Sequence, residues 1–388
     1  MHPRRPLQTA RLPIVGGERE AGYPAVGALV QQPGDQYQGS FCTGTLIAPR
    51  FVLTAAHCLN GRRADQTWFF LGDDAVPRAG GQRPPGRFVP VAALRAHPGF
   101  RLGSPIGVYD VAVVELAEAV EDVAPLPLRR GDVAALRGQA LTYVGFGVDD
   151  GGAQRGGGLK RRADLTLADL GASLYVSFAD ARSVCYGDSG GPGLGAGADG
   201  ALEVVGVNSS VFGEAPCGGG SIQVRVDAFA SWIDAAIGGA PACGCACEAA
   251  CGADGVCDPL ACGDGDGCRL LVECLSACNN AGCSVRCFED ATGPARGRYE
   301  AVVACGSERC AGVADQGACL AERCPDPWGA CLADLPPGAD DCATLLGCLG
   351  GCRDRACSLD CYAAGSAEAR AQYDGLAACV AMECAEFA

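Results

Sequence analysis

Cysteine divides this chain into two regions of unlike chemistry. Of its 27 cysteines, 23 lie after residue 242. Such a density indicates disulfides or metal sites. The three histidines, His2, His57 and His97, all precede the cysteine-rich region, which disfavours a cysteine and histidine ligand set there. We therefore expect disulfides, no metal, and a secreted or otherwise extracytoplasmic protein.

The cysteines of the second region repeat at an offset of 74 residues. The series 268, 274, 278, 283, 287, 305 and 310 recurs as 342, 348, 352, 357, 361, 379 and 384, with identical gaps. A fixed offset indicates tandem structural units. We predict a linker at residues 239–246, repeat 1 at residues 247–310 and repeat 2 at residues 311–388.

Each repeat contains two Cys-x-x-x-Cys pairs, and this spacing places both cysteines on one face of a helix. In repeat 1 the pairs predict two short helices joined as a hairpin. Spacing does not fix connectivity, and we choose the nested pairing Cys274–Cys287 and Cys278–Cys283. A third helix is expected at 299–305, with its copy at 373–379. The second region is therefore predicted to be a small α-helical, disulfide-rich structure, in which we recognise no family.

Most of the negative charge also lies in this region. The formal net charge is −15, and residues 243–388 hold 22 Asp and Glu against 9 Lys and Arg, a balance of −13. An acidic surface excludes nucleic acid and anionic membranes as partners. No run of eighteen apolar residues predicts a membrane span. The basic residues 1–6 lead into no apolar stretch, so no secretory signal is visible. We expect an upstream start or another export route.

Three motifs in the first region supply the groups that activate a serine. Residues 187–192, Gly-Asp-Ser-Gly-Gly-Pro, place Ser189 in a turn whose N–H groups can converge on one point. Serine is a weak nucleophile without a base. Residues 54–58, Thr-Ala-Ala-His-Cys, offer His57 as the base, and Asp110 leads an apolar strand. A carboxylate facing a core needs hydrogen-bond donors, and a histidine N–H is one.

These motifs, together with Ile-Val-Gly-Gly at 14–17, follow the order of the trypsin/chymotrypsin-like serine proteases. Residues 14–238 resemble that family, which implies an all-β fold of two six-stranded antiparallel barrels and no cofactor. The resemblance implies that His57, Asp110 and Ser189 are catalytic, with an oxyanion hole formed by the N–H groups of Gly187 and Ser189. A helix is expected within 227–237. His97, in a loop-like stretch, is predicted to be an exposed residue without a partner.

The resemblance also implies two disulfides, Cys42–Cys58 and Cys185–Cys217. The family's usual bridge in the loop before the nucleophile is missing, because no cysteine lies between Cys58 and Cys185. Residues 1–13 resemble a short propeptide. In the family, cleavage before Ile14 frees an amine that pairs with the acid before the nucleophile, here Asp188. Pro13 departs from the Arg or Lys that usually precedes this cut, so a trypsin-like activator is not expected.

The resemblance assigns four residues to substrate binding: Ser183, Ser209, Val211 and Ser221. Trypsin-like members carry an aspartate at the position of Ser183 on the pocket floor, where it holds a basic side chain. Serine lacks that charge, and Val211 replaces a glycine that normally opens the pocket. We therefore expect an uncharged, small or medium side chain at P1, the substrate residue whose carbonyl is attacked.

The sequence thus predicts a secreted serine endopeptidase with a protein or peptide substrate, whose second region binds an unknown ligand or surface partner. One alternative stays open. The protease fold could be a catalytically silent scaffold that acts through the cysteine-rich region.

Overall fold

The structure is a computed structural model of the chain. It describes residues 14, 17–34, 36–102, 106–180, 182–213, 217–238, 267–278, 280–332, 346 and 348. The chain divides into two compact units. Unit 1 comprises residues 1–263 with 275–290, and unit 2 comprises residues 264–274 with 291–388.

The first half of unit 1 is a closed antiparallel barrel. Its six strands follow one another around the barrel in the order β2-β3-β4-β7-β6-β5. They are β2 (Val26–Gln31), β3 (Gly39–Ala48), β4 (Phe51–Thr54), β5 (Thr67–Leu71), β6 (Arg87–Ala96) and β7 (Ala112–Leu116). Aromatic rings fill its interior, with Phe70 and Phe88 at 4.8 Å between centroids. Gly27 permits this packing, because a Cβ there would lie only 2.6 Å from the Phe69 ring.

The second half of unit 1 is a seven-stranded antiparallel sheet in the order β1-β9-β10-β13-β12-β11-β8. Its strands are β1 (Glu18–Arg19), β8 (Ala140–Gly145), β9 (Arg161–Leu170), β10 (Leu174–Phe178), β11 (Pro192–Ala196), β12 (Leu202–Phe212) and β13 (Gly220–Arg225). A further pairing of β8 with β9 closes six of these strands into a second barrel. Alternate residues of β9 point into the core, as expected for a strand with one buried face.

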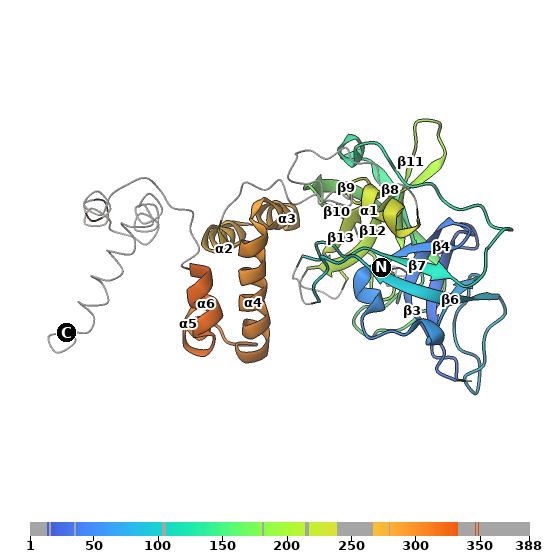
Figure 1. The fold of residues 1–388 in the computed structure, drawn as a ribbon, viewed down its shortest axis with the longest axis horizontal. Helices are drawn as coiled ribbons and strands as arrows, with labels where there is room; N and C mark the ends of the chain where they lie inside the picture. The colour runs from blue at the N-terminus through green and yellow to red at the C-terminus, as the bar shows by residue number, and fades with distance from the viewer. Residues whose placement is uncertain are drawn as a thin grey trace, which may run out of the picture. The chain divides into compact units, whose positions relative to one another are not determined.

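Both predicted six-stranded barrels are therefore confirmed (Figure 1). The helix expected within 227–237 is α1 (Ala230–Ala236), which buries Trp232 and Ile233. Three short 3-10 helices, η1 (Ala56–Leu59), η2 (Ala64–Gln66) and η3 (Val133–Leu136), connect strands.

The helices expected in repeat 1 are present. They are α2 (Cys268–Ala277), α3 (Ala281–Asp290) and α4 (Gly293–Arg309), followed by α5 (Gln316–Arg323) and α6 (Pro325–Leu332). The α2 helix crosses the boundary between the units, α3 belongs to unit 1, and α4 to α6 pack together in unit 2. None of the described helices combines the length and apolar character needed to cross a bilayer.

Disulfides hold these short helices. Cys278–Cys283 forms as predicted. Cys274 and Cys287 are each disulfide-bonded, and their pairing with one another stays a prediction. Unit 2 contains Cys305–Cys324, Cys310–Cys319 and Cys268–Cys331. All three join repeat 1 to repeat 2 as these repeats were predicted, so the predicted boundary at residue 310 falls inside one disulfide-linked group of helices. The propeptide, the linker and the helix expected at 373–379 lie outside the described residues.

Candidate active site

His57 and Asp110 meet at the end of β4 and the start of β7. His57 lies in η1 directly after β4, and the disulfide Cys42–Cys58 ties this turn to β3. Asp110 precedes β7, and it is only 2% exposed. The Nδ1 atom of His57 lies 2.7 Å from Oδ2 of Asp110. Since the carboxylate is an acceptor, this contact places the proton of a neutral imidazole on Nδ1 and leaves Nε2 free to act as a base.

Asp110 accepts two further hydrogen bonds. The backbone N–H of His57 donates to Oδ1 at 2.8 Å. The hydroxyl of Ser209 donates to Oδ2 at 2.6 Å. A buried carboxylate requires such hydrogen-bond donors, and Asp110 has three of them. The sequence singled out Ser209 for substrate binding, but gave no sign of this bond, because the two residues are 99 positions apart.

Tyr109, the residue before Asp110, belongs to an aromatic cluster. Tyr109 has a φ of +60°, a backbone conformation that few non-glycine residues adopt. Its ring stacks on His97 at 4.9 Å between centroids, and both rings contact Phe229. His97 also contacts Trp232, and it is 8% exposed. The prediction of an exposed His97 without a partner was therefore wrong, because its aromatic neighbours are distant in sequence.

Ser189 lies in a turn held against the first barrel. The carbonyl of Ser189 accepts from the N–H of Thr43 at 2.9 Å, and the Thr43 hydroxyl donates to the carbonyl of Gly187 at 2.9 Å. Gly187 has a φ of +95°, where a side chain is strained. Among the described residues, the N–H groups of Gly187 and Ser189 have no acceptor. They are therefore available to an oxyanion.

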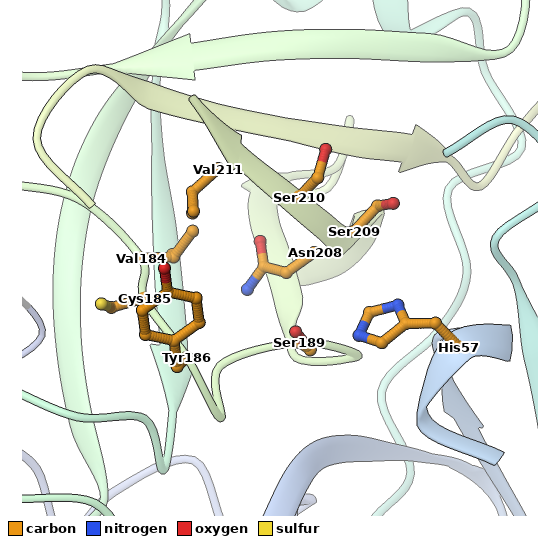
Figure 2. A pocket seen from close by; sticks show the side chains of 9 residues that line it. All are labelled: His57, Val184, Cys185, Tyr186, Ser189, Asn208, Ser209, Ser210 and Val211. Carbon is orange, nitrogen blue, oxygen red and sulfur yellow. The ribbon is translucent and has the colours of Figure 1, made fainter. Parts of the chain in front are cut away.

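His57 and Ser189 line the same pocket, and one imidazole nitrogen faces Ser189 in Figure 2. No hydrogen bond joins Nε2 of His57 to Oγ of Ser189 in the part of the chain that the structure describes. Contacts of this kind often shorten only when substrate binds.

Asp188, the residue before Ser189, is completely buried. Its carboxylate accepts from the N–H groups of Gly147 at 2.7 Å and Cys185 at 2.8 Å. Burial nevertheless raises the pKa of Asp188 from an ordinary 3.8 to about 6, with the nearby Arg161 acting in the opposite direction. A fully buried carboxylate with a raised pKa is a site that would be stabilised by another cation.

Ile14 lies in the core of the second barrel. Its side chain is fully buried in a cluster that includes Tyr143 and Val184. Val184 directly precedes Cys185, whose N–H is one of the two donors to Asp188. The pairing of a freed Ile14 amine with Asp188 stays a prediction.

The pocket has a volume of about 360 Å³ and nine lining residues, among them His57, Ser189, Ser209 and Val211 (Figure 2). The disulfide Cys185–Cys217 forms as predicted, and Cys185 also lines the pocket. Ser183 and Ser221, which were also predicted to bind substrate, are 1% and 0% exposed and are not among these nine residues. The hydroxyl of Ser183 donates to the carbonyl of Val184 at 3.0 Å.

Three residues near the site lie close enough together to be considered as ligands of one metal ion. The ligand atoms of Cys42, His57 and Cys58 all lie within 4.8 Å of one another. The two cysteines are joined in a disulfide, however, and a metal is bound by thiolates rather than by disulfide sulfur. These residues therefore do not fit a metal ion.

Comparison with known proteins agrees with this geometry. The sequence model of the family described as "Trypsin" matches residues 14–233. Over 222 residues the chain is 31% identical to proproteinase E of Bos taurus, covering 50% of this chain and 83% of that protein. It is 29% identical over 235 residues to chymotrypsin-like elastase family member 3B of Homo sapiens, covering 52% of this chain and 82% of that protein.

A third relative is phenoloxidase-activating factor 3 of Holotrichia diomphalia, with 31% identity over 216 residues. The match covers 47% of this chain and 60% of that protein, so the chain spans less than two thirds of this relative. The family match covers more than half of the chain, in the barrels that carry His57, Asp110 and Ser189. The chain therefore belongs to the trypsin family of serine proteases.

Proposed function

We propose that this protein is a secreted serine endopeptidase that uses His57, Asp110 and Ser189. The observation that carries the proposal is the buried Asp110, whose three donors fix the imidazole of His57 in the pocket that also contains Ser189. The disulfides of both units support secretion, because such bonds persist in oxidising compartments.

In the proposed reaction, Oγ of Ser189 attacks the peptide carbonyl while Nε2 of His57 takes its proton. Asp110 stabilises the resulting imidazolium, and the N–H groups of Gly187 and Ser189 hold the oxyanion. His57 then gives the proton to the leaving amine, and the C–N bond breaks to leave an ester on Ser189. Water hydrolyses this ester, with His57 again acting as base.

Activation is proposed to depend on the free amine of Ile14. Cleavage before Ile14 would place a positive charge near Asp188, whose burial raises its pKa. Opposite charges then stabilise one another away from water, and the pair acts as a switch because either charge alone is unfavourable there. The pairing would hold the turn from Gly187 to Ser189 in the shape that binds the oxyanion.

The proposed P1 residue is uncharged and small or medium in size. The valine side chains of Val184 and Val211 narrow the pocket, and Ser183 places no charge behind it. Two of the relatives are named as members of the chymotrypsin-like elastase family. A peptide library with all residues at P1 tests this preference, and preferred cleavage after Arg or Lys would contradict it.

A fluorophosphonate probe tests the catalytic proposal directly. We expect it to label Ser189 in protein that begins at Ile14, and to label neither Ser189→Ala nor the native protein after denaturation. Asp110→Asn should lower kcat by about 10⁴-fold, because its amide no longer favours the productive tautomer. Absence of labelling in a folded protein would favour the scaffold alternative, in which the cysteine-rich region carries the function.

A further inference from the structure

We propose that Asn208 makes this protease selective for P1 side chains that donate a hydrogen bond, such as threonine, serine and asparagine. Apolar side chains of the same shape, such as valine, would be cleaved more slowly. This inference rests on the proposed endopeptidase activity and names its substrate class.

Asn208 is a buried amide in the pocket wall. It is 2% exposed, and Figure 2 shows its amide between Val184 and Ser189 in this view. Its backbone carbonyl accepts from the N–H of Gly190 at 2.8 Å, and its N–H donates to the carbonyl of Gly191 at 2.9 Å. These bonds fix Asn208 to the turn of the nucleophile, so its side chain has a defined position relative to the scissile bond.

The amide of Asn208 has a fixed orientation as well. Its Nδ2 donates to the carbonyl of Asp188 at 3.1 Å, which leaves Oδ1 as the atom available to a ligand. The only described donor to Oδ1 is Nε2 of Gln223, at the long distance of 3.4 Å. A carbonyl oxygen accepts two hydrogen bonds, so Oδ1 has capacity for a stronger donor.

Further polar side chains lie next to Asn208, and two of their oxygen atoms lack hydrogen-bond partners among the described residues. Gln223 is fully buried, and its Nε2 donates to the hydroxyl of Ser221 at 2.6 Å. Within the described residues, Oε1 of Gln223 and the hydroxyl oxygen of Ser210 are buried without a partner. Burying a polar atom without a hydrogen-bond partner is unfavourable. A ligand that supplied a donor to this region would therefore gain more than one that supplied a methyl group.

The charge and width of the pocket limit the donors that fit. Among the described residues that line it, the ionisable groups are His57 and the phenol of Tyr186, so none of these lining side chains offers a carboxylate to a lysine or arginine at P1. Burying an unpaired charge is unfavourable. Val184 and Val211 occupy the same wall and leave room for short side chains. A neutral hydroxyl or primary amide satisfies both limits.

Sites with buried hydrogen-bonding groups discriminate strongly against substrates that lack the matching group. We expect kcat/KM to be at least about tenfold higher for P1 threonine than for P1 valine, and for P1 asparagine than for P1 leucine. Each comparison keeps the shape of the side chain and changes its hydrogen bonding.

The experiment measures these two ratios on full-length protein cleaved before Ile14. Asn208→Val should bring both ratios to one or below, and Gln223→Met should lower them by acting one layer further back. Gln139→Met is the matched control, because Gln139 is exposed in the same barrel, and it should leave the ratios unchanged. Equal rates for the two members of each pair in the unmodified protein, or ratios that persist in Asn208→Val, would overturn the proposal.

A measurement that does not depend on the P1 residue separates the role of Asn208 from the proposed endopeptidase activity. Each variant is titrated with a fluorophosphonate and with p-nitrophenyl acetate. Labelling and an acyl burst without P1 discrimination would reject only the role of Asn208. A folded protein that shows neither would reject the endopeptidase and this selectivity together. Labelling of Asn208→Val also shows that its site has folded.

Discussion

At the scale of single residues, two buried aspartates have opposite environments. Asp110 accepts hydrogen bonds from the backbone N–H and the ring of His57 and from the hydroxyl of Ser209. His57 in turn lines the pocket. Among the described residues, Asp188 accepts hydrogen bonds from two backbone N–H groups, and burial raises its pKa to about 6. The carboxylate of Asp110 therefore has side-chain partners in the structure, whereas the carboxylate of Asp188 would be stabilised by the proposed amine of Ile14.

The raised pKa of Asp188 predicts how stability depends on pH before cleavage. A raised carboxyl pKa contributes stability that is present below about pH 4 and lost as pH rises through about 6. A shift of about two units corresponds to about 3 kcal/mol. In uncleaved Ser189→Ala protein, which cannot digest itself, this loss should appear in urea unfolding between pH 4 and 8. Asp188→Asn should remove it.

Cleavage before Ile14 should change the sign of this effect. The new amine lowers the pKa of Asp188, so the ion pair then contributes stability at neutral pH that is lost on acidification. The same urea titration on cleaved Ser189→Ala protein provides the control. An unchanged pH dependence after cleavage would contradict the Ile14–Asp188 pair.

At the scale of elements, α3 supports the turn between β9 and β10. Glu289 of α3 is 3% exposed and accepts from the N–H and the hydroxyl of Ser173 at 2.8 and 2.6 Å. Arg286 pairs with Asp169 at the end of β9. Gly171 permits this close approach, because a Cβ there would overlap the Glu289 carboxylate. A helix from the cysteine-rich sequence thus packs on the second barrel.

This contact predicts a stability effect that does not involve the proposed catalytic residues. Glu289→Ala leaves the buried donors of Ser173 unpaired and should lower the free energy of unfolding of unit 1 by about 1–3 kcal/mol. Burial raises the pKa of Glu289, so its carboxyl favours the fold most at low pH. Glu289→Gln should therefore reduce the pH dependence of urea unfolding. Glu322→Ala, at an exposed position on α5, is the control and should change neither quantity.

At the scale of the whole molecule, the two units are stabilised in different ways. The barrels of unit 1 bury large apolar cores and contain the disulfides Cys42–Cys58 and Cys185–Cys217. In the described residues, unit 2 has the helices α4 to α6, the first part of α2, and three disulfides. Small structures of this kind depend on covalent links, because their cores alone bury too little apolar surface.

The length of the closed loop predicts which link matters most in unit 2. Cys268–Cys331 spans 63 residues and Cys310–Cys319 spans 9. Loop-closure entropy gives about 4 kcal/mol for the first and about 3 kcal/mol for the second. Replacing the first pair by alanine should therefore increase hydrogen exchange in α4 and α6 more than replacing the second. Cys42→Ala/Cys58→Ala, a change in unit 1, should leave this exchange unchanged. Equal effects of the two unit 2 pairs would contradict the loop-length argument.

Local patterns in the sequence predicted much of this molecule. The motifs around His57, Asp110 and Ser189 carried the family resemblance that implied the barrels, and cysteine spacing predicted the first helices of the second region. Spacing left the pairing of those cysteines open, and Cys278–Cys283 was one choice among the alternatives. The helices depend on spacing along the chain, which the sequence displays directly. The burial of His97, by contrast, depends on rings from two other segments, Tyr109 before β7 and Phe229 and Trp232 at α1, so local pattern predicted the wrong environment for it.

By itself, the sequence determined which chemical groups this protein possesses: a hydroxyl in a glycine-rich turn, an imidazole, two carboxylates, and cysteines in a repeating series. Tertiary structure decided what those groups contact. Ser209 reaches Asp110 across 99 residues, and Glu289 reaches Ser173 across 116. Hydrogen bonds form only within a narrow range of distance and angle. The packing of whole strands and helices brings the donor and acceptor atoms within that range. The local sequence around each residue does not encode this packing.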